Sequence, residues 1–221
     1  MPTIVVTRHG LTTRSVPEQH LGQRIDVGLS ADGRAQAAAL AERIAGAPFA
    51  RIITSPLRRA VETARAISAG ADVPRPPIEP DRRLLEMDYG AWEGLTYEEI
   101  EATDGPRRRA WEADPAGLAC PGGESGNDVA ARVSGLLSDV LEAARASAGP
   151  VLLVGHSTVN RVLACLVLGV PVGQYRRRFV QGQVNLTAFE WRPDDLALDA
   201  ASALLLNDLG HVRRPPELPW G

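Results

Sequence analysis

The chain has 221 residues, a length that fits one sizeable domain of about 100–200 residues, or one with a small insertion. Hydrophobic residues make up 44% and charged residues 23%, which is typical of a globular protein and excludes a disordered or fibrous chain. The formal net charge of -3 argues against a general nucleic-acid binder. All 24 basic residues are arginine, which excludes mechanisms that depend on a catalytic or phosphate-binding lysine.

The cysteines and the apolar segments indicate the setting of the protein. Cys120 and Cys165 lie far apart without a CxxC motif, so we expect neither a disulfide framework nor a thiolate zinc site. The apolar stretch Val162–Val170 is too short to span a bilayer, and the first residues lack the pattern of a signal peptide. We therefore expect a cytoplasmic protein without a membrane partner.

Short apolar runs in the sequence predict the strands. Thr3–Thr7 and Val151–Gly155 are compact runs without alternation, which is typical of strands buried on both faces of a parallel sheet, and Arg51–Thr54 is similar but shorter. The alternating run Val184–Trp191 and the segment Leu196–Leu206 predict two later strands.

Helical patterns separate these runs. Ser30 can cap a helix that extends to about Gly46, and Ser55 followed by Pro56 predicts the start of a second helix. The strongest amphipathic pattern covers Asp128–Ala146. Strands that alternate with helices predict an α/β fold, here a three-layer sandwich with a mostly parallel central sheet.

A segment of different composition interrupts this alternation. After the proline-rich connector Val73–Pro80, residues 84–126 contain turn residues and short helices, one of which begins at a capping box formed by Thr96 and Glu99. We interpret this segment as a small helical insertion over the sheet edge. The tail 212–221 is expected to be irregular, and residues 1–221 form one domain.

The positions of the histidines indicate a site. His9 and His156 fall just past the ends of the two clearest predicted strands, whereas His20 is expected to be a loop residue and His211 a structural one. Ligands of open parallel sheets bind outside the carboxyl ends of the strands. A lone histidine is usually structural, but two at matching strand ends predict a shared crevice.

Arginines provide the positive charge of this predicted site. Arg8 adjoins His9, and Arg58 is predicted in the first turn of a helix, where the helix dipole disfavours a cation. A phosphate bound at that helix N-terminus would explain the placement. The alternative is a solvated arginine, which we expect of Arg59 more than of Arg58. No carboxylate lies at metal-ligand spacing from the histidines, so we expect no metal.

A proton donor is expected from the start of the insertion. Glu86 follows two leucines, which predicts partial burial, and burial favours the neutral form of a carboxyl group. Asp88 and Glu93 are the competing candidates for this role. The nearby aromatic residues Tyr89 and Trp92 either contact the leaving group or belong to the core.

Together these residues carry a family resemblance. Thr7-Arg8-His9-Gly10 resembles the signature of the histidine phosphatase (phosphoglycerate mutase-like) superfamily. The resemblance continues in the family's order through Leu29–Gly33, Ser55–Thr63, Leu85-Glu86, Trp92–Gly94, Pro121–Ser125, Gly155–Ser157 and Asn207–His211. The three-letter motif alone is weak, but the ordered set covers nearly the whole chain and is specific.

The resemblance implies phosphoryl transfer through a phosphohistidine, without a metal or other cofactor. It implies His9 as the nucleophile, Glu86 as the proton donor, and a set of ligands of the phosphoryl oxygens: Arg8, Arg58, His156, Thr12, Ser15 and Ser157. Two positions depart from the family pattern. Ser15 stands where asparagine is usual, and Ser157 stands where the family commonly has glycine.

The block from Glu86 to Thr96 resembles the phosphatase branch and lacks the lysine of the mutases. We therefore expect a phosphomonoesterase that acts on a small phosphorylated metabolite, with a cofactor-dependent phosphoglycerate mutase and a non-catalytic adaptor as alternatives. A homodimer is common in this family. The clusters Arg107–Arg109 and Arg176–Arg178 are expected to be solvated faces, or one of them recognises a second acidic group on the substrate.

Overall fold

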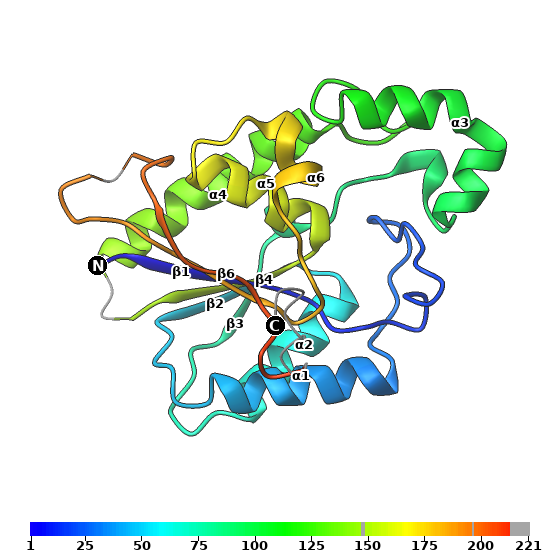
Figure 1. Cartoon of the computed structure of the whole chain (residues 1–221). Helices are drawn as coiled ribbons and strands as arrows, with labels where there is room; N and C mark the ends of the chain where they lie inside the picture. Colours follow the sequence, from blue (N-terminus) through cyan, green and yellow to red (C-terminus); the bar gives the residue numbers. More distant parts are fainter. Residues whose placement is uncertain (147–148, 196, 213–221) are drawn as a thin grey trace, which may run out of the picture.

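The computed structural model describes residues 1–146, 149–195 and 197–212, and in these residues a six-stranded sheet lies between two helical layers (Figure 1). The strands are β1 (Thr3–Arg8), β2 (Arg51–Thr54), β3 (Ile78–Pro80), β4 (Val151–Gly155), β5 (Leu186–Glu190) and β6 (Ser202–Asp208). The helices are α1 (Ala31–Arg43), α2 (Arg58–Ala69), α3 (Tyr97–Ala113), α4 (Gly126–Ala146), α5 (Ser157–Val167) and α6 (Tyr175–Arg178), with 3-10 turns at Arg82–Leu84, Gly90–Trp92 and Val172–Gln174.

The strand order is β3-β2-β4-β1-β5-β6. β3, β2, β4 and β1 run parallel, β5 pairs antiparallel with β1, and β6 pairs antiparallel with β5. Figure 1 shows α1 and α2 on one face and α4 and α5 on the other, which confirms the predicted three-layer sandwich with a mostly parallel sheet.

The sheet divides the buried hydrophobic residues into two clusters. Every residue of β4 is buried, because this strand lies between two others and is covered on both faces. Ile4 and Leu153 belong to the cluster that includes the apolar stripe of α4, whereas Leu152 and Ile52 belong to the cluster with α1 and α2. Apolar runs without alternation are the sequence signal of this two-sided burial.

The structure corrects several predicted strand boundaries. β3 lies inside the segment that we predicted as a proline-rich connector; it is a short edge strand, a position that tolerates the missing N–H of Pro80. β6 begins at Ser202 rather than at Leu196, which lies outside the described residues. The predicted irregular tail also falls outside them, apart from Val212.

Helix starts depend on tertiary contacts as well as local sequence. Ser30 caps α1 as predicted, since its hydroxyl accepts a hydrogen bond from the backbone N–H of Gly33 at 3.0 Å. The second helix begins at Arg58 and not at Pro56. Its first backbone N–H donates to the carboxylate of Asp26 at 2.6 Å, so a residue from a distant loop caps this helix.

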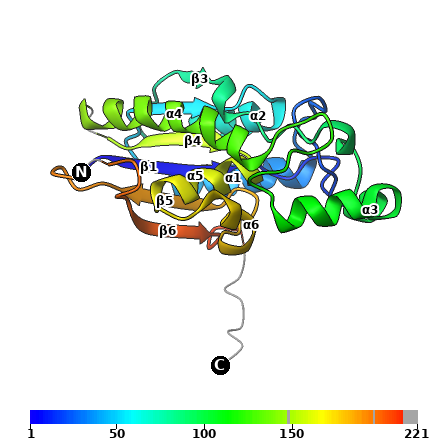
Figure 2. The same ribbon diagram turned by 90° about the horizontal axis from the view of Figure 1, so that it is seen from above.

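The insertion covers the edge of the sheet formed by the carboxyl ends of β1 and β4 (Figure 2). The predicted capping box is confirmed, because the Thr96 hydroxyl accepts from the N–H of Glu99 while the Glu99 carboxylate accepts from the N–H of Thr96. α3 is kinked at Asp104. In the part of the chain that the structure describes, no helix is long and apolar enough to cross a membrane.

Candidate active site

The two histidines at the strand ends meet. Arg8 pairs with Gly155 in the parallel ladder of β1 and β4, so the next residue of each strand, His9 or His156, leaves the sheet at the same place. The ring centroids are 5.1 Å apart, with the planes at 61°. This arrangement confirms the prediction that the two imidazoles share one edge of the sheet.

One hydrogen bond sets the tautomer of His9. Its Nδ1–H donates to the carbonyl oxygen of Gly10 at 2.7 Å, which leaves the lone pair on Nε2. Burial, together with the positive charges of Arg59 and Arg8, lowers the pKa of His9 well below its ordinary value. The imidazole is therefore neutral near pH 7, the form that a nucleophile requires.

His156 has the opposite tautomer. Its Nδ1 accepts a hydrogen bond from the guanidinium Nε of Arg59 at 3.3 Å, so the proton of the neutral ring is on Nε2. Burial, followed by the charge of Arg59, lowers the pKa of His156 well below its ordinary value. His156 Nε2 is buried and has no hydrogen-bond partner among the described residues. It is a donor available to an anion in contact with His9.

The structure corrects our choice between two neighbouring arginines. The side chain of Arg58 is 67% exposed and pairs with Glu62 at 2.6 Å, outside the cavity at His9. Arg59 is only 1% exposed, lines that cavity and also donates to the carbonyl oxygen of Gly22 at 2.8 Å. The helix N-terminus that we expected to bind phosphate is occupied by the carboxylate of Asp26.

The helical period of α2 contains the signal that we missed. Arg59 shares its helix face with Thr63 and with the fully buried residues Ala60, Ala64 and Ile67. Arg58 instead lies four residues before Glu62, a spacing that allows an ion pair on the helix surface. The apolar face therefore indicates which arginine turns inward.

Arg8 is held in the cavity by contacts from distant segments. Its backbone N–H donates to the Asn185 side chain at 3.2 Å, and its guanidinium donates to the Gln181 carbonyl oxygen at 2.9 Å and to the Glu18 carboxylate at 3.0 Å. Glu18 is 70% exposed, so this ion pair is solvated at the mouth of the cavity. The loop before β5 thus positions the first arginine of the site.

Glu86 is the buried carboxylate that lines the cavity. It is 7% exposed, and its side chain accepts hydrogen bonds from the backbone N–H groups of Met87, Thr158 and Val159 at 2.9, 3.1 and 3.2 Å. Two of these donors belong to the first turn of α5, where the helix dipole stabilises negative charge. The three donors therefore hold the Glu86 side chain in place.

The competing carboxylates point elsewhere. Both oxygens of Glu93 accept from backbone N–H groups, of Gln23 and Arg24 at 2.8 Å each, and burial raises the pKa of Glu93. Asp88 accepts from the N–H of Gly90 at 2.8 Å. Neither Glu93 nor Asp88 lines the cavity.

The predicted hydroxyl ligands separate into two groups. Ser15 and Ser157 line the cavity. Thr12 is buried outside the lining, where its hydroxyl and its backbone N–H each contact the Ser15 hydroxyl at 3.0 Å. Thr12 therefore positions Ser15, which corrects the expectation that Thr12 itself contacts the phosphate.

Several lining residues of the cavity were not predicted from sequence. His20, which we expected to be a loop residue, lies edge-on to Tyr89 with ring centroids 4.9 Å apart. Tyr89 shares a 2.7 Å hydrogen bond with the hydroxyl of Thr158. Arg161 and Arg176 also line the cavity, whose volume is about 420 Å³. Two histidines, His9 and His20, and four arginines therefore line the cavity, with His156 behind His9.

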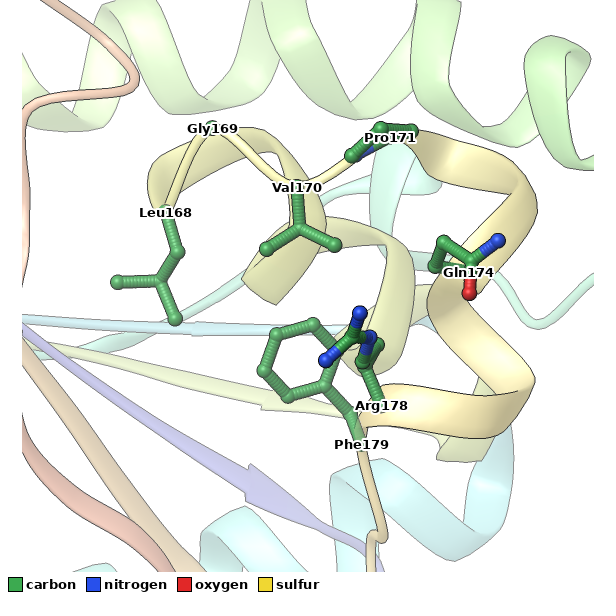
Figure 3. Close-up of a pocket in the computed structure, with 7 residues that line it drawn as sticks. All are labelled: Leu168, Gly169, Val170, Pro171, Gln174, Arg178 and Phe179. Carbon is green, nitrogen blue, oxygen red and sulfur yellow. The ribbon is translucent and has the colours of Figure 1, made fainter.

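A second surface pocket, of about 670 Å³, lies between α5 and α6 (Figure 3). Its lining is mostly apolar, and Arg178 is the one ionisable residue in it. The acid–base and nucleophilic groups lie in the other cavity. Among the residues that the structure describes, no three His, Cys, Asp or Glu side chains cluster as metal ligands.

Comparison with known proteins agrees with this geometry. The sequence model of the histidine phosphatase superfamily (branch 1) matches residues 4–203. The chain is 37% identical over 177 residues to glucosyl-3-phosphoglycerate phosphatase of Mycolicibacterium vanbaalenii, covering 78% of this chain and 76% of that protein. It is 29% identical over 175 residues to phosphoserine phosphatase 1 of Hydrogenobacter thermophilus, covering 79% and 80%.

The fold gives the same result. The solved structure of a mycobacterial glucosyl-3-phosphoglycerate phosphatase in complex with VO3 superposes with a TM-score of 0.82 at 30% identity. The superposition covers 94% of this chain and 99% of that one. The family match extends over most of the chain and includes the arginine and histidine at the end of β1 and the histidine after β4. The chain therefore belongs to the histidine phosphatase superfamily, branch 1.

Proposed function

We propose that this protein hydrolyses a small phosphomonoester through a phosphohistidine on His9. One observation carries the proposal: His9, with its unprotonated Nε2, lines a cavity together with Arg8 and Arg59, and the ring of His156, whose Nε2–H has no partner among the described residues, packs edge-on to that of His9. A neutral nucleophile surrounded by cationic and N–H donors is the arrangement that phosphoryl transfer requires, because charge on the equatorial oxygens must be stabilised.

The first step forms the phosphoenzyme. His9 Nε2 attacks phosphorus, the bond from phosphorus to the ester oxygen breaks, and Glu86 gives a proton to that oxygen as the alcohol leaves. Arg8, Arg59 and His156 hold the phosphoryl oxygens. Arg59 has two functions in this step, because it also sets the tautomer that makes His156 a donor.

The second step regenerates the enzyme. Glu86, now a carboxylate, takes a proton from water as the water oxygen attacks phosphorus and the bond to His9 Nε2 breaks. The three backbone N–H groups that contact Glu86 stabilise it in this ionised form. The products are inorganic phosphate and neutral His9, and Glu86 is protonated for the next cycle.

The named relatives guide the choice of substrates. Two mycobacterial relatives, 37% and 34% identical to the chain, are glucosyl-3-phosphoglycerate phosphatases, and a third relative is a phosphoserine phosphatase. We propose that the substrate is a small phosphorylated metabolite of this kind, with glucosyl-3-phosphoglycerate as the first compound to test.

A phosphoglycerate mutase is the second candidate, because the chain is 39% identical over 133 residues to a 2,3-bisphosphoglycerate-dependent phosphoglycerate mutase of Gloeobacter violaceus. That match covers 60% of the chain, less than the matches to the phosphatases. One assay separates the two activities. With 3-phosphoglycerate, a phosphatase releases inorganic phosphate, whereas a mutase forms 2-phosphoglycerate at constant phosphate.

The non-catalytic alternative fails if phosphate is released from any phosphomonoester in a panel that includes p-nitrophenyl phosphate. The proposed hydrolase fails if none of the panel is hydrolysed. The buried, free thiols of Cys120 and Cys165 support the proposed cytoplasmic setting. The expected homodimer stays a prediction, which light scattering tests. The expected absence of nucleic-acid and membrane partners also stays a prediction.

A further inference from the structure

Two arginines in the cavity have no part in the phosphoryl chemistry. Arg161 follows Ser157 by four residues in α5, so both lie on the helix face that borders the cavity. Arg176 enters from α6. Both residues line the cavity together with His20 and Tyr89. Arg161 and Arg176 are thus a second pair of arginines in the cavity, beyond the pair assigned to the phosphoryl group.

The positive charge of this second pair is incompletely balanced. Arg161 forms no ion pair among the described residues, and its buried Nε has no hydrogen-bond partner there. Arg176 contacts Glu112 at 3.4 Å, but Glu112 also pairs with Arg108 at 2.9 Å. One carboxylate is thus shared by two guanidinium groups. Arg161 has no carboxylate within ion-pair distance among the described residues, and the charge of Glu86 acts on it from farther away.

The surroundings hold both side chains in place. The guanidinium of Arg176 stacks on the Trp111 ring, 4.6 Å from its centroid, which restricts its orientation. Burial lowers the pKa of Arg161, and the nearby charges of Arg8 and Arg176 add to this effect. A half-buried cation next to other cations is stabilised when an anion binds between them.

We infer that Arg161 and Arg176 bind a carboxylate on the leaving group of the substrate. This inference rests on the proposed phosphatase function, since it assigns the part of the cavity beside the phosphoryl site. Planar guanidinium groups match a carboxylate through paired N–H···O bonds. A carboxylate would supply the ion-pair partner that Arg161 lacks among the described residues. His20 Nδ1 donates to the Leu95 carbonyl oxygen at 3.2 Å, so Nε2 of the neutral ring is an acceptor that a hydroxyl group of the substrate would match.

Two pairs of compounds test this assignment, because the members of each pair differ only at the acid group. 3-Phosphoglycerate has a carboxylate where glycerol 3-phosphate has a hydroxymethyl group. O-phosphoserine has a carboxylate where O-phosphoethanolamine has a hydrogen atom. We expect the wild-type enzyme to favour the acid in each pair by about 10- to 100-fold in kcat/KM, the size of a charged hydrogen-bonded contact. Arg161→Gln and Arg176→Gln should each reduce this ratio by about tenfold or more.

Arg177→Gln is the matched control. Arg177 is exposed, belongs to the same short helix as Arg176 and does not line the cavity. Its variant removes the same charge and should keep the wild-type ratio. A parallel loss of the ratio in Arg177→Gln would mean that general electrostatic attraction, and not a subsite, selects the acid.

Other outcomes separate the two proposals. Equal kcat/KM for the acid and neutral members in the wild type would overturn the carboxylate subsite and leave the phosphatase function intact. Equal losses for both members in Arg161→Gln and Arg176→Gln would assign these residues a structural role. Failure to hydrolyse any compound, p-nitrophenyl phosphate included, would overturn the proposed function and the subsite with it.

Discussion

The guanidinium Nε of Arg59 donates a 3.3 Å hydrogen bond to Nδ1 of His156, and both side chains are buried beside His9. Through this contact a residue of α2 determines which nitrogen of His156 carries the proton, although His156 follows a different strand, β4. His9 has its free lone pair on Nε2 and His156 has its proton on Nε2, so one ring can attack phosphorus while the other donates to it.

The first prediction compares Arg59 with its exposed neighbour. Arg59→Gln removes a phosphoryl ligand and releases the His156 tautomer, so kcat/KM should fall by something on the order of 10²–10³ or more. Arg58→Gln, the matched control, changes a solvated side chain and should stay within about threefold of wild type. Steady-state assays with one phosphomonoester measure both. The reverse order of effects would restore the assignment that we made from sequence.

The second prediction concerns Glu86. Glu86→Gln removes the proton donor, which an alkoxide leaving group needs and a nitrophenolate does not. The phosphorylation step with an alkyl phosphate should therefore slow by about 10²–10⁴-fold, and the same step with p-nitrophenyl phosphate far less.

Burst kinetics are required here, because Glu86 also acts as the base of the second step. The variant should accumulate phosphoenzyme on p-nitrophenyl phosphate. If phosphorylation slows equally for both leaving groups, Glu86 has a positioning role, and the proton donor must be sought among other carboxylates.

The third prediction is a loss of stability in mild acid. Burial and the neighbouring arginines lower the pKa values of His9 and His156 in the folded state. In the unfolded chain both side chains have the ordinary histidine pKa of about 6.5. As the pH falls through that value, the unfolded chain binds protons that the folded chain does not, so the free energy of unfolding decreases. The limiting slope is about 1.4 kcal/mol per pH unit for each such histidine.

Urea unfolding at pH 7.5, 6.5 and 5.5 measures this effect, in a range where exposed carboxylates stay ionised. Below pH 6.5 the unfolding of His9→Gln should take up one proton fewer than that of the wild type, so its unfolding free energy should depend less steeply on pH. Its m-value should be unchanged. An unfolding free energy that is constant or rises on acidification would contradict the neutral, buried state of the pair.

The fourth prediction is that chelation has no effect. Four arginines line the cavity with His9, so in the proposed mechanism the charge that a magnesium ion supplies in other phosphotransferases comes from side chains. Activity in excess EDTA should equal that in its absence. A loss that a divalent ion restores would mean that the reaction depends on a metal.

The sheet and its flanking helices could be predicted because their residues repeat with clear periods. The buried runs of β1 and β4 and the stripe of α4 determine the layers, and the two strand ends then bring His9 and His156 together. His211, expected to be structural, contacts the carbonyl oxygen of Val184 at 2.9 Å and lies outside the cavity. These features depend on local pattern and on general rules for parallel sheets.

Features that depend on contacts between distant segments could not be predicted. The carboxylate of Asp26 sets the start of α2, and this contact joins residues 32 positions apart. Arg161 and Arg176 both line the cavity because α5 and α6 pack together, and the sequence does not specify the relative position of these helices. Arg59 is different, because the periodicity of α2 already indicated that it faces inward.

The most direct test of the central claim is to trap the phosphoenzyme. Wild-type protein quenched during turnover of a ³²P-labelled phosphomonoester should retain label that is stable in alkali and labile in acid, as a phosphoramidate is, and peptide mapping should place it on His9. His9→Ala should retain no label and lose turnover, while Arg58→Gln, folded and quenched in the same way, should be labelled like wild type. A His9→Ala protein that keeps more than a few per cent of wild-type turnover, or a wild-type label on another residue, would contradict the mechanism.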